Sequence, residues 1–251
     1  MPTVTLRAAG WFRWKLSSTE PIAPCLPKAR GCTMFPVNEV FQTIQGEASY
    51  TGTPSVFLRL QGCPVGCPWC DTKHTWHIAP EHAVTISAML EKQTDAPTYA
   101  QMTCQDLVDT VRKFQARHVV ITGGEPCSYD LTELTTQLIG LGYSVQIETS
   151  GTYPVRVHPR TWVTVSPKIG MPGGLTVLPD ALSRANEIKH PVGRERDIDN
   201  LRVVLLEANP QALVWLQPLS QSAKATALCI REATANGWRV SIQTHKFLGV
   251  R

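Results

Sequence analysis

Short apolar runs and amphipathic stretches of helical length alternate along most of the chain. Runs typical of buried strands occur at 56–60, 119–122, 145–149, 162–166, 214–217 and 239–244. Segments with apolar residues at helical spacing occur at 103–113, 131–141, 179–185, 198–206 and 222–236. This alternation predicts an α/β fold with a mostly parallel sheet, because the helices then connect neighbouring strands. Segment 91–104 is polar, and we expect an irregular connection there.

The first 33 residues differ from the rest of the chain. They contain four prolines and no sustained apolar period. Basic and aromatic residues near the start are not followed by an apolar core, so a signal peptide is not predicted. We expect a disordered extension at 1–33 and one structured domain at 34–251, with Met34 as an alternative start.

Composition narrows the class of protein. The chain has 251 residues, which is enough for one large α/β domain. No apolar run reaches the roughly 18 residues that a membrane helix needs, so no membrane partner is expected. The net charge of +4 comes without a block of Lys or Arg, and we expect no direct contact with nucleic acid.

Three of the eight cysteines, Cys63, Cys67 and Cys70, lie within eight residues of one another. The scatter of the others favours a reducing compartment, the cytoplasm, with one metal or redox site. Three thiolates on a tight loop suit three irons of a cubane cluster and leave the fourth iron open to a ligand. The alternative is zinc, with His74 or His77 as a fourth ligand.

Polar residues also come after several of the predicted strands. Thr122 begins the stretch Thr-Gly-Gly-Glu-Pro, and Ser150, Lys168, Ser220 and His245 occupy similar places after later runs. Because the carboxyl ends of parallel strands meet at one edge of a sheet, we expect a binding site there.

The cysteine spacing C-x3-C-x2-C, with Trp69 before the third cysteine, resembles the signature of the radical S-adenosylmethionine superfamily. Residues 122–126 resemble its second motif. Further stretches, in this order, are similar to the 7-carboxy-7-deazaguanine synthase family: 39–47, 57–63, 69–76, 146–152, 165–168, 216–218 and 243–246. The resemblance covers about residues 35–248, and the short cysteine spacing is that of enterobacterial-type members. It implies a partial TIM-type barrel with a mostly parallel sheet.

The resemblance implies a lyase that converts 6-carboxy-5,6,7,8-tetrahydropterin to 7-carboxy-7-deazaguanine with loss of ammonia, in queuosine and related deazapurine biosynthesis. It implies a [4Fe–4S] cluster, S-adenosylmethionine and Mg²⁺ as cofactors. A flavodoxin-type electron donor and a homodimer are expected on the same basis. The alternatives are another radical enzyme, such as a glycyl-radical activase, and a non-catalytic zinc or electron-transfer protein.

The same resemblance implies a set of site residues. Cys63, Cys67 and Cys70 hold the cluster and are catalytic. The cofactor S-adenosylmethionine is expected to contact Trp69, Cys70, Asp71, Gly124, Ser166, Pro167, Lys168, Gln217, Pro218, Leu219 and Ser220, with Ser150 and Gly151 as additions. The pterin is expected to contact Ile44, Gln45, Gly46, Glu47, Arg59, Thr122 and His245. Thr72 is expected to bind Mg²⁺.

Two of these positions, and Ala48 beside one of them, carry specific expectations. Glu47 suits the amino and ring N–H groups of a pterin, because a carboxylate accepts hydrogen bonds in pairs. Arg59 lies inside an apolar strand, so it should face the substrate carboxylate or form an internal salt bridge with Glu47 or Asp71. Ala48 stands where the family usually has Gly, so the backbone there should be ordinary or slightly shifted.

Overall fold

The computed structural model describes residues 33–250. Apart from Thr33, the predicted extension at 1–33 lies outside the described residues, as does Arg251.

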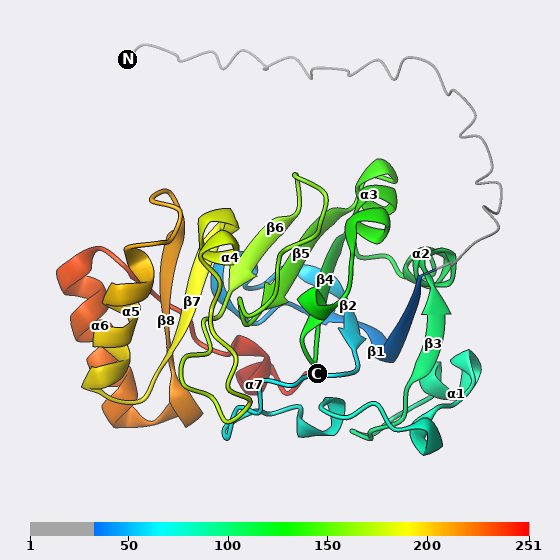
Figure 1. Cartoon of the computed structure of the whole chain (residues 1–251), viewed down its shortest axis with the longest axis horizontal. Helices are drawn as coiled ribbons and strands as arrows, with labels where there is room; N and C mark the ends of the chain where they lie inside the picture. The colour runs from blue at the N-terminus through cyan, green and yellow to red at the C-terminus, as the bar shows by residue number, and fades with distance from the viewer. Residues whose placement is uncertain (1–32, 251) are drawn as a thin grey trace, which may run out of the picture. The chain divides into compact units, whose positions relative to one another are not determined.

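The described chain forms one nine-stranded sheet in the order β3-β1-β2-β4-β5-β6-β7-β8-β9. The strands are β1 Met34–Ile44, β2 Pro54–Leu60, β3 Ala100–Thr103, β4 His118–Gly123, β5 Ser144–Thr149, β6 Trp162–Val165, β7 Glu187–Val192, β8 Leu213–Pro218 and β9 Arg239–Val240. From β2 to β9 all neighbours are parallel, whereas β1 runs antiparallel to β2 and to β3. The sheet does not close on itself, so the predicted partial barrel with a mostly parallel sheet is confirmed (Figure 1).

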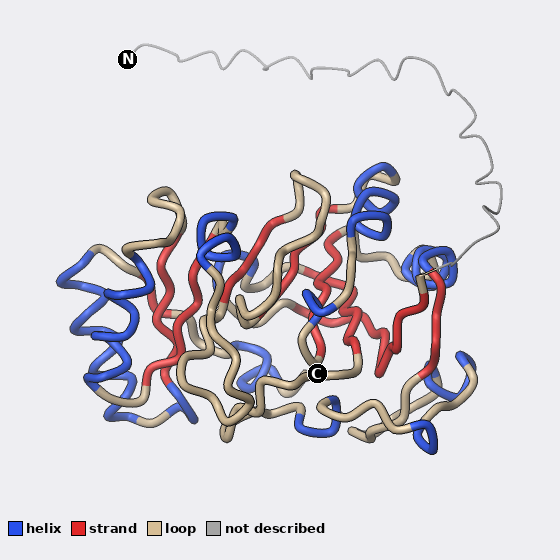
Figure 2. Tube along the Cα trace, viewed as in Figure 1, coloured by secondary structure: helices blue, strands red, loops and turns tan. Residues whose placement is uncertain are grey.

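The main helices come after the strands and cover the outer side of this sheet (Figures 1 and 2). The α-helices are α1 Ile86–Leu90, α2 Cys104–Val111, α3 Thr132–Gly140, α4 Pro179–Arg184, α5 Glu195–Leu205, α6 Ala223–Asn236 and α7 Thr244–Leu248. Short 3-10 turns occur at Ala48–Tyr50, Lys73–Thr75, Pro80–His82, Pro126–Ser128 and Leu219–Gln221. In residues 33–250, no helix is both long and apolar enough to cross a bilayer.

Local signals set the ends of several helices. α2 begins at a capping box, in which the Thr103 hydroxyl accepts from the Asp106 N–H and the Asp106 carboxylate accepts from the Thr103 N–H. α3 is followed by Gly142 and α6 by Gly237, both at positive φ, 85° and 67°. Glycine takes up this conformation without a steric penalty, which explains why these helices end where the sequence predicts.

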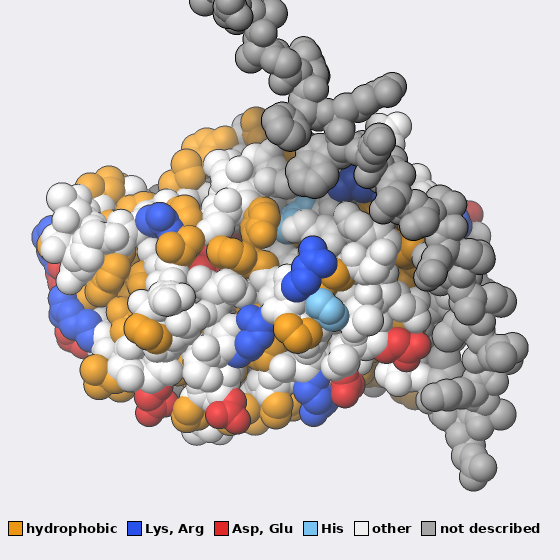
Figure 3. Space-filling model, turned by 90° about the horizontal axis from the view of Figure 1, so that it is seen from above, with side chains coloured by type: hydrophobic (Ala, Val, Ile, Leu, Met, Phe, Trp, Pro, Cys, Tyr) orange, Lys and Arg blue, Asp and Glu red, His pale blue; other side chains and the backbone are white. Residues whose placement is uncertain are grey.

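The core lies between the sheet and the helices. Leu58, Ile121 and Ile147 are fully buried on three adjacent strands, and Leu107 on α2 and Leu134 on α3 belong to the same buried cluster. On the face seen in Figure 3, Lys and Arg side chains are scattered among uncharged and apolar ones. This distribution matches the small net charge of +4.

Two predicted elements are confirmed only in part. The strand expected at 239–244 has only two residues, because the Thr244 N–H bonds the Gly46 carbonyl and α7 begins there. His245 therefore lies in a helix beside the end of β1. The polar segment 91–104 is not wholly irregular, because β3 pairs with β1 in it. β7 was not predicted, since Lys189, His190 and Pro191 interrupt its apolar run.

Ala48 also departs from expectation. Its φ is 53°, in the left-handed region, so this backbone keeps a geometry that favours glycine. Hydrogen bonds hold it there: the Ala48 N–H donates to the Ser241 hydroxyl at 3.0 Å, and the Thr51 N–H and hydroxyl donate to the Ala48 carbonyl. An ordered loop therefore carries the strain, which is roughly 1–2 kcal/mol for a residue with a Cβ.

The contact between β2 and β4 predicts a large difference between two glycines. A Cβ on Gly123 would lie 2.2 Å from the Leu60 nitrogen, whereas one on Gly142 would meet nothing within 4 Å. Both glycines have positive φ, so both alanine variants are strained. We expect Gly123→Ala to lower the free energy of unfolding by about 3 kcal/mol and Gly142→Ala by about 1 kcal/mol. Urea unfolding of both variants measures this, and equal losses would contradict a steric role for the contact.

Candidate functional site

The carboxyl ends of the parallel strands line a cavity of about 270 Å³. The cysteine loop comes after β2, Thr122 and Gly123 end β4 and are followed by Gly124 and Glu125, and Ser150 comes directly after β5. Ser166 and Lys168 come after β6, and Gln217 and Pro218 end β8 and are followed by Leu219 and Ser220. The prediction that polar residues after the strands gather at one edge is confirmed for these strands.

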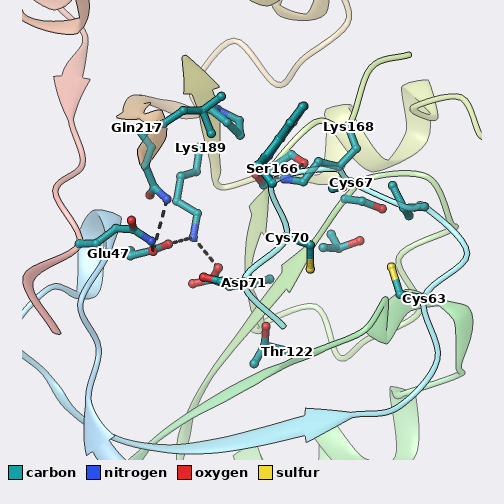
Figure 4. A pocket seen from close by; sticks show the side chains of 18 of the residues that line it. Glu47, Cys63, Cys67, Cys70, Asp71, Thr122, Ser166, Lys168, Lys189 and Gln217 are labelled. Carbon is teal, nitrogen blue, oxygen red and sulfur yellow. Dashed lines mark hydrogen bonds and ion pairs between the residues drawn. The ribbon is translucent and has the colours of Figure 1, made fainter. Parts of the chain in front are cut away.

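The three cysteines of the motif lie together on one wall of this cavity. Cys63, Cys67 and Cys70 all line it, while Cys104, Cys127 and Cys229 are buried elsewhere. Figure 4 shows the three on one side and Glu47, Lys189 and Gln217 on the other. The loop is tied to the next segment of the chain, since the Gly62 and Cys63 N–H groups bond the Thr75 and Trp76 carbonyls.

This donor set fits a cluster better than a single ion. In residues 33–250, no three His, Cys, Asp or Glu side chains are grouped closely enough to hold one metal ion. Neither His74 nor His77 lines the cavity with the thiols. A cubane needs thiolates spread around a larger body, and three thiols leave one of its irons open. The cysteine wall is therefore suited to a [4Fe–4S] cluster.

Two close backbone contacts hold the cysteine loop in place. A Cβ on Gly124 would lie 2.1 Å from the Gly62 carbonyl oxygen, and the Glu125 N–H donates to the same oxygen at 2.8 Å. A Cβ on Gly173 would lie 1.9 Å from the Pro64 carbonyl oxygen. These positions need residues without side chains, because the turn after β4 and the loop after β6 both pack directly on the loop.

Glu125, in the Gly-Gly-Glu-Pro stretch, is buried and fully engaged within the protein. Its carboxylate accepts from the Thr149 hydroxyl, from the Cys127 N–H and from the N–H and hydroxyl of Ser150. It therefore joins the loops after β4 and β5. Ser150 lines the cavity but is committed to this contact, and Gly151 does not line the cavity.

Burial makes two of the thiols weak acids. It raises the pKa of Cys63 to about 11, with the charges of Glu125 and the other two cysteines adding to the rise. It also raises the pKa of Cys67, although the nearby Lys168 ammonium opposes the rise. Both thiols are therefore protonated at neutral pH until a metal replaces the protons.

Cys70 has two polar neighbours that the sequence did not assign to it. The Trp76 indole N–H donates to the Cys70 sulfur at 3.4 Å, and the Thr72 hydroxyl lies 3.6 Å from the same atom. Hydrogen bonds to ligand sulfurs adjust the potential of iron–sulfur clusters. Trp76 is thus a hydrogen-bond donor to Cys70, a role that its position after the motif in the sequence does not reveal.

The residues expected to contact S-adenosylmethionine line the first cavity, except Gly151 and Pro167; both are buried and do not line it. Lys168 reaches back to Ser166, donating to its hydroxyl at 2.5 Å and to its carbonyl at 3.1 Å. Burial lowers the pKa of Lys168, and the negative groups around it oppose this. Gln217 donates to Glu47 at 3.3 Å, so it links the cofactor residues to the pterin residues.

A second cavity of about 170 Å³ adjoins the first. Every residue expected to contact the pterin lines it, namely Ile44, Gln45, Gly46, Glu47, Arg59, Thr122 and His245. Thr72, Phe41 and Phe57 line it as well. Glu47, Asp71, Thr122 and Glu148 line both cavities. Gly46 makes room for α7, because a Cβ there would lie 2.2 Å from His245 Nδ1.

The salt bridge expected as an alternative for Arg59 exists, but with a different partner. Arg59 Nε lies 2.5 Å from Glu39 Oε1, so the partner is Glu39 rather than Glu47 or Asp71. The two residues face each other because the β1–β2 register pairs Glu39 with Arg59. Arg59 also lines the second cavity, so its guanidinium retains donors on the ligand side.

Two residues outside the predicted set, Glu148 and Lys189, occupy the centre of the site. The Lys189 ammonium donates to Glu47 and to Glu148, and its side chain is only 5% exposed. Burial alone would raise the pKa of Glu47, but Lys189 and hydrogen bonds from Lys189 and Gln243 lower it to about 2. Both residues are polar side chains that face the cavity from within a strand. The sequence could have indicated them only after the limits of the strands were known, because the direction of a side chain alternates along a strand.

The raised thiol pKa values predict that cluster assembly depends on pH. Each ligand binds as a thiolate, so iron uptake releases protons and is favoured as pH rises. We expect anaerobic reconstitution to be faster and more complete at mildly alkaline than at mildly acidic pH. Lys168→Met should move this profile to higher pH, because Lys168 opposes the rise in the Cys67 pKa. Bound iron measured against pH tests this, and a flat profile would contradict it.

Removing the indole N–H beside Cys70 should change the electronics of a bound cluster. Trp76→Phe keeps an aromatic ring but loses the donor to the sulfur. The reduced cluster carries more negative charge and benefits more from the bond, so we expect a more negative midpoint potential. A redox titration followed by electron paramagnetic resonance measures it. Trp238→Phe is the control, because Trp238 is partly buried against the core and lines neither cavity; equal potentials in both variants would exclude the role.

This chain is similar to known proteins in both sequence and structure. A model described as the Radical SAM superfamily matches residues 58–163. The 7-carboxy-7-deazaguanine synthase of Escherichia coli K12 is 52% identical over 221 residues, covering 86% of this chain and 99% of that protein. The one from Buchnera aphidicola is 43% identical with the same coverage. The crystal structure of QueE from Escherichia coli matches with a TM-score of 0.81 and 51% identity, covering 84% of this chain and 94% of that one. The chain belongs to the 7-carboxy-7-deazaguanine synthase family of radical S-adenosylmethionine enzymes.

Proposed function

We propose that this protein is a radical S-adenosylmethionine lyase that converts 6-carboxy-5,6,7,8-tetrahydropterin to 7-carboxy-7-deazaguanine with loss of ammonia, in deazapurine and queuosine biosynthesis. One observation carries the proposal. The residues assigned to the cofactor and those assigned to the pterin occupy two adjoining cavities that share four residues. Two ligands bound there would lie against each other, as a hydrogen transfer between them requires.

On this proposal, Cys63, Cys67 and Cys70 would hold a [4Fe–4S] cluster, and the residues on the other sides of the same cavity would hold S-adenosylmethionine beside it. When bound, the cluster and the cofactor supply the electron and the radical that begin the reaction. The protein's own task is to bind, orient and exclude water. Lys168 and Ser166 present an ammonium and a hydroxyl to the cofactor, and Gln217 presents an amide at the boundary with the second cavity.

The second cavity is suited to a small polar ring. Glu47 and Glu148 offer carboxylate oxygens to N–H groups, while Arg59 and His245 offer donors to an anion such as the substrate carboxylate. Phe41 and Phe57 stack with ring centroids 5.4 Å apart and form an apolar side of the cavity. A glycyl-radical activase would act on a segment of another protein, and this set of paired acceptors and donors favours the pterin instead.

Several further features belong to the proposal. Thr72 lines the second cavity, and its hydroxyl is an oxygen ligand that Mg²⁺ accepts together with water and a substrate carboxylate. A flavodoxin-type electron donor and a homodimer are proposed from the family. A cytoplasmic location is supported by the six described cysteines, which are all free thiols.

Anaerobic turnover tests the proposal directly. Protein reconstituted with iron and sulfide is incubated with the carboxylated tetrahydropterin, S-adenosylmethionine, Mg²⁺ and a reductant, and the product is identified by its mass and ultraviolet spectrum. We expect the deazaguanine acid from the wild type and from Cys229→Ala, whose thiol is buried in α6 away from the site. Cys67→Ala should form none, since one cluster ligand is missing. Cleavage of S-adenosylmethionine with the pterin untouched would retain the radical chemistry and reject the substrate.

A further inference from the structure

Lys189 is assigned to neither the cofactor nor the pterin, and yet two carboxylates converge on it. It projects from β7 and donates to Oε2 of Glu47, in the loop after β1, and to Oε2 of Glu148, on β5. Glu47 and Glu148 are about 100 residues apart in sequence. Figure 4 shows the Lys189 ammonium directed at Glu47 inside the cavity. The ammonium therefore holds together two acids that the chain brings from separate strands.

Both carboxylates keep unused capacity to accept hydrogen bonds. A carboxylate has about four lone-pair positions on its two oxygens. Within the described residues, Glu47 accepts three bonds, from Lys189, Gln217 and Gln243. Glu148 accepts two, from Lys189 and Gln45. The lone pairs that remain free belong to two adjacent carboxylates, Glu47 and Glu148, and both residues line both cavities. The site is therefore suited to a ligand that presents several N–H donors along one edge of its ring.

Without the ammonium, two acids this close would not both stay ionised. Like charges in a poorly hydrated site raise the pKa of one partner, which then takes up a proton and ceases to be a pure acceptor. Burial alone would lower the pKa of Lys189, but Glu148 and Glu47 outweigh it and raise that pKa above its ordinary value. The other charged or titratable groups that line the two cavities or lie beside them are Arg59, Cys63, Cys67, Cys70, Asp71, Glu125, Lys168, Glu187, His245 and Lys246.

We propose that Lys189 is a positioning residue of the pterin site, which holds Glu47 and Glu148 side by side as two ionised acceptors for the amino and ring N–H edge of the substrate. The proposal rests on the proposed function and deepens it, because it assigns the specificity for that edge to one residue. A ring with a carbonyl in place of the amino group would set an acceptor against these acceptors and would be rejected.

The test measures pterin binding rather than turnover. Cluster-loaded enzyme with S-adenosylmethionine and no reductant is titrated anaerobically with 6-carboxytetrahydropterin by calorimetry at several pH values around neutrality. In Lys189→Met we expect binding about tenfold weaker or more at neutral pH, because one acceptor is protonated. Its affinity should rise with pH relative to the wild type, since the raised pKa of the acid pair is then exceeded.

A matched variant shows whether any loss of a partly buried lysine has this effect. Lys92 donates to Asn38 and to two backbone carbonyls, and it lines neither cavity. Lys92→Met should bind the pterin within about twofold of the wild type, with the wild-type pH profile. The same change of affinity and profile in both variants would overturn the proposal.

A double variant keeps the test decisive if Lys189→Met is poorly folded. In Lys189→Met/Glu47→Gln only one carboxylate of the pair remains, so the repulsion is relieved. We expect recovery of thermal stability and cluster content, weak pterin binding, and loss of the added pH dependence. A Lys189→Met protein that binds the pterin with wild-type affinity and profile would overturn the proposal, as would a double variant that retains the added pH dependence.

The two proposals fail in different ways. If the wild type neither binds nor converts the pterin, the proposed function falls and the role of Lys189 falls with it. If the wild type converts the pterin and discriminates against the analogue that has a carbonyl in place of the amino group, the proposed function stands whatever Lys189 does. In that case the Lys189→Met variant alone tests the role of Lys189. Our proposal requires that this variant lose most of the preference for the pterin over the analogue with the carbonyl.

Discussion

The site depends on one backbone contact, where the end of β2 lies against the end of β4. Leu60 pairs with Gly123 in the parallel ladder, and the Glu125 N–H then bonds the Gly62 carbonyl at the start of the cysteine loop. No side chain fits between these strands at Gly123 or Gly124. The cysteine loop and the floor of the cavity are therefore built as one unit. Residues from β5, β6 and β8 can be aimed at the thiols because that unit is fixed.

The buried charges at the centre of the site form one compensated group, in which Lys189 lies between Glu47 and Glu148. A buried charge without a partner costs several kcal/mol, so this group must form as a set when the strands come together. Gln45, Gln217 and Gln243 complete the set with neutral donors. They orient the carboxylates without adding charge.

Prediction from sequence succeeded where function is carried by contiguous residues. The cysteine motif and the Gly-Gly-Glu-Pro stretch each lie on one short loop, so residues that are close together in the chain are also close together in the fold. It failed where two strands had to be aligned first. The partner of Arg59 is Glu39 because of the β1–β2 register, and a register is not visible in either strand alone. Ala48 shows a related limit, since a hydrogen bond to the Ser241 hydroxyl and hydrogen bonds from Thr51 hold a backbone geometry that its residue type disfavours.

The sequence by itself determined the fold class and the grouping of Cys63, Cys67 and Cys70, and its resemblance to a known family pointed to most of the residues that line the two cavities. Alternation of strands and helices and the motifs are local properties, and the resemblance to a known family added the assignment of each residue to a ligand. Only the tertiary structure decided that Glu47, Glu148 and Lys189 form one group and that Trp76 reaches Cys70. The reason is physical: these contacts join side chains from different strands and loops, and their energies depend on burial that exists only after the sheet has formed.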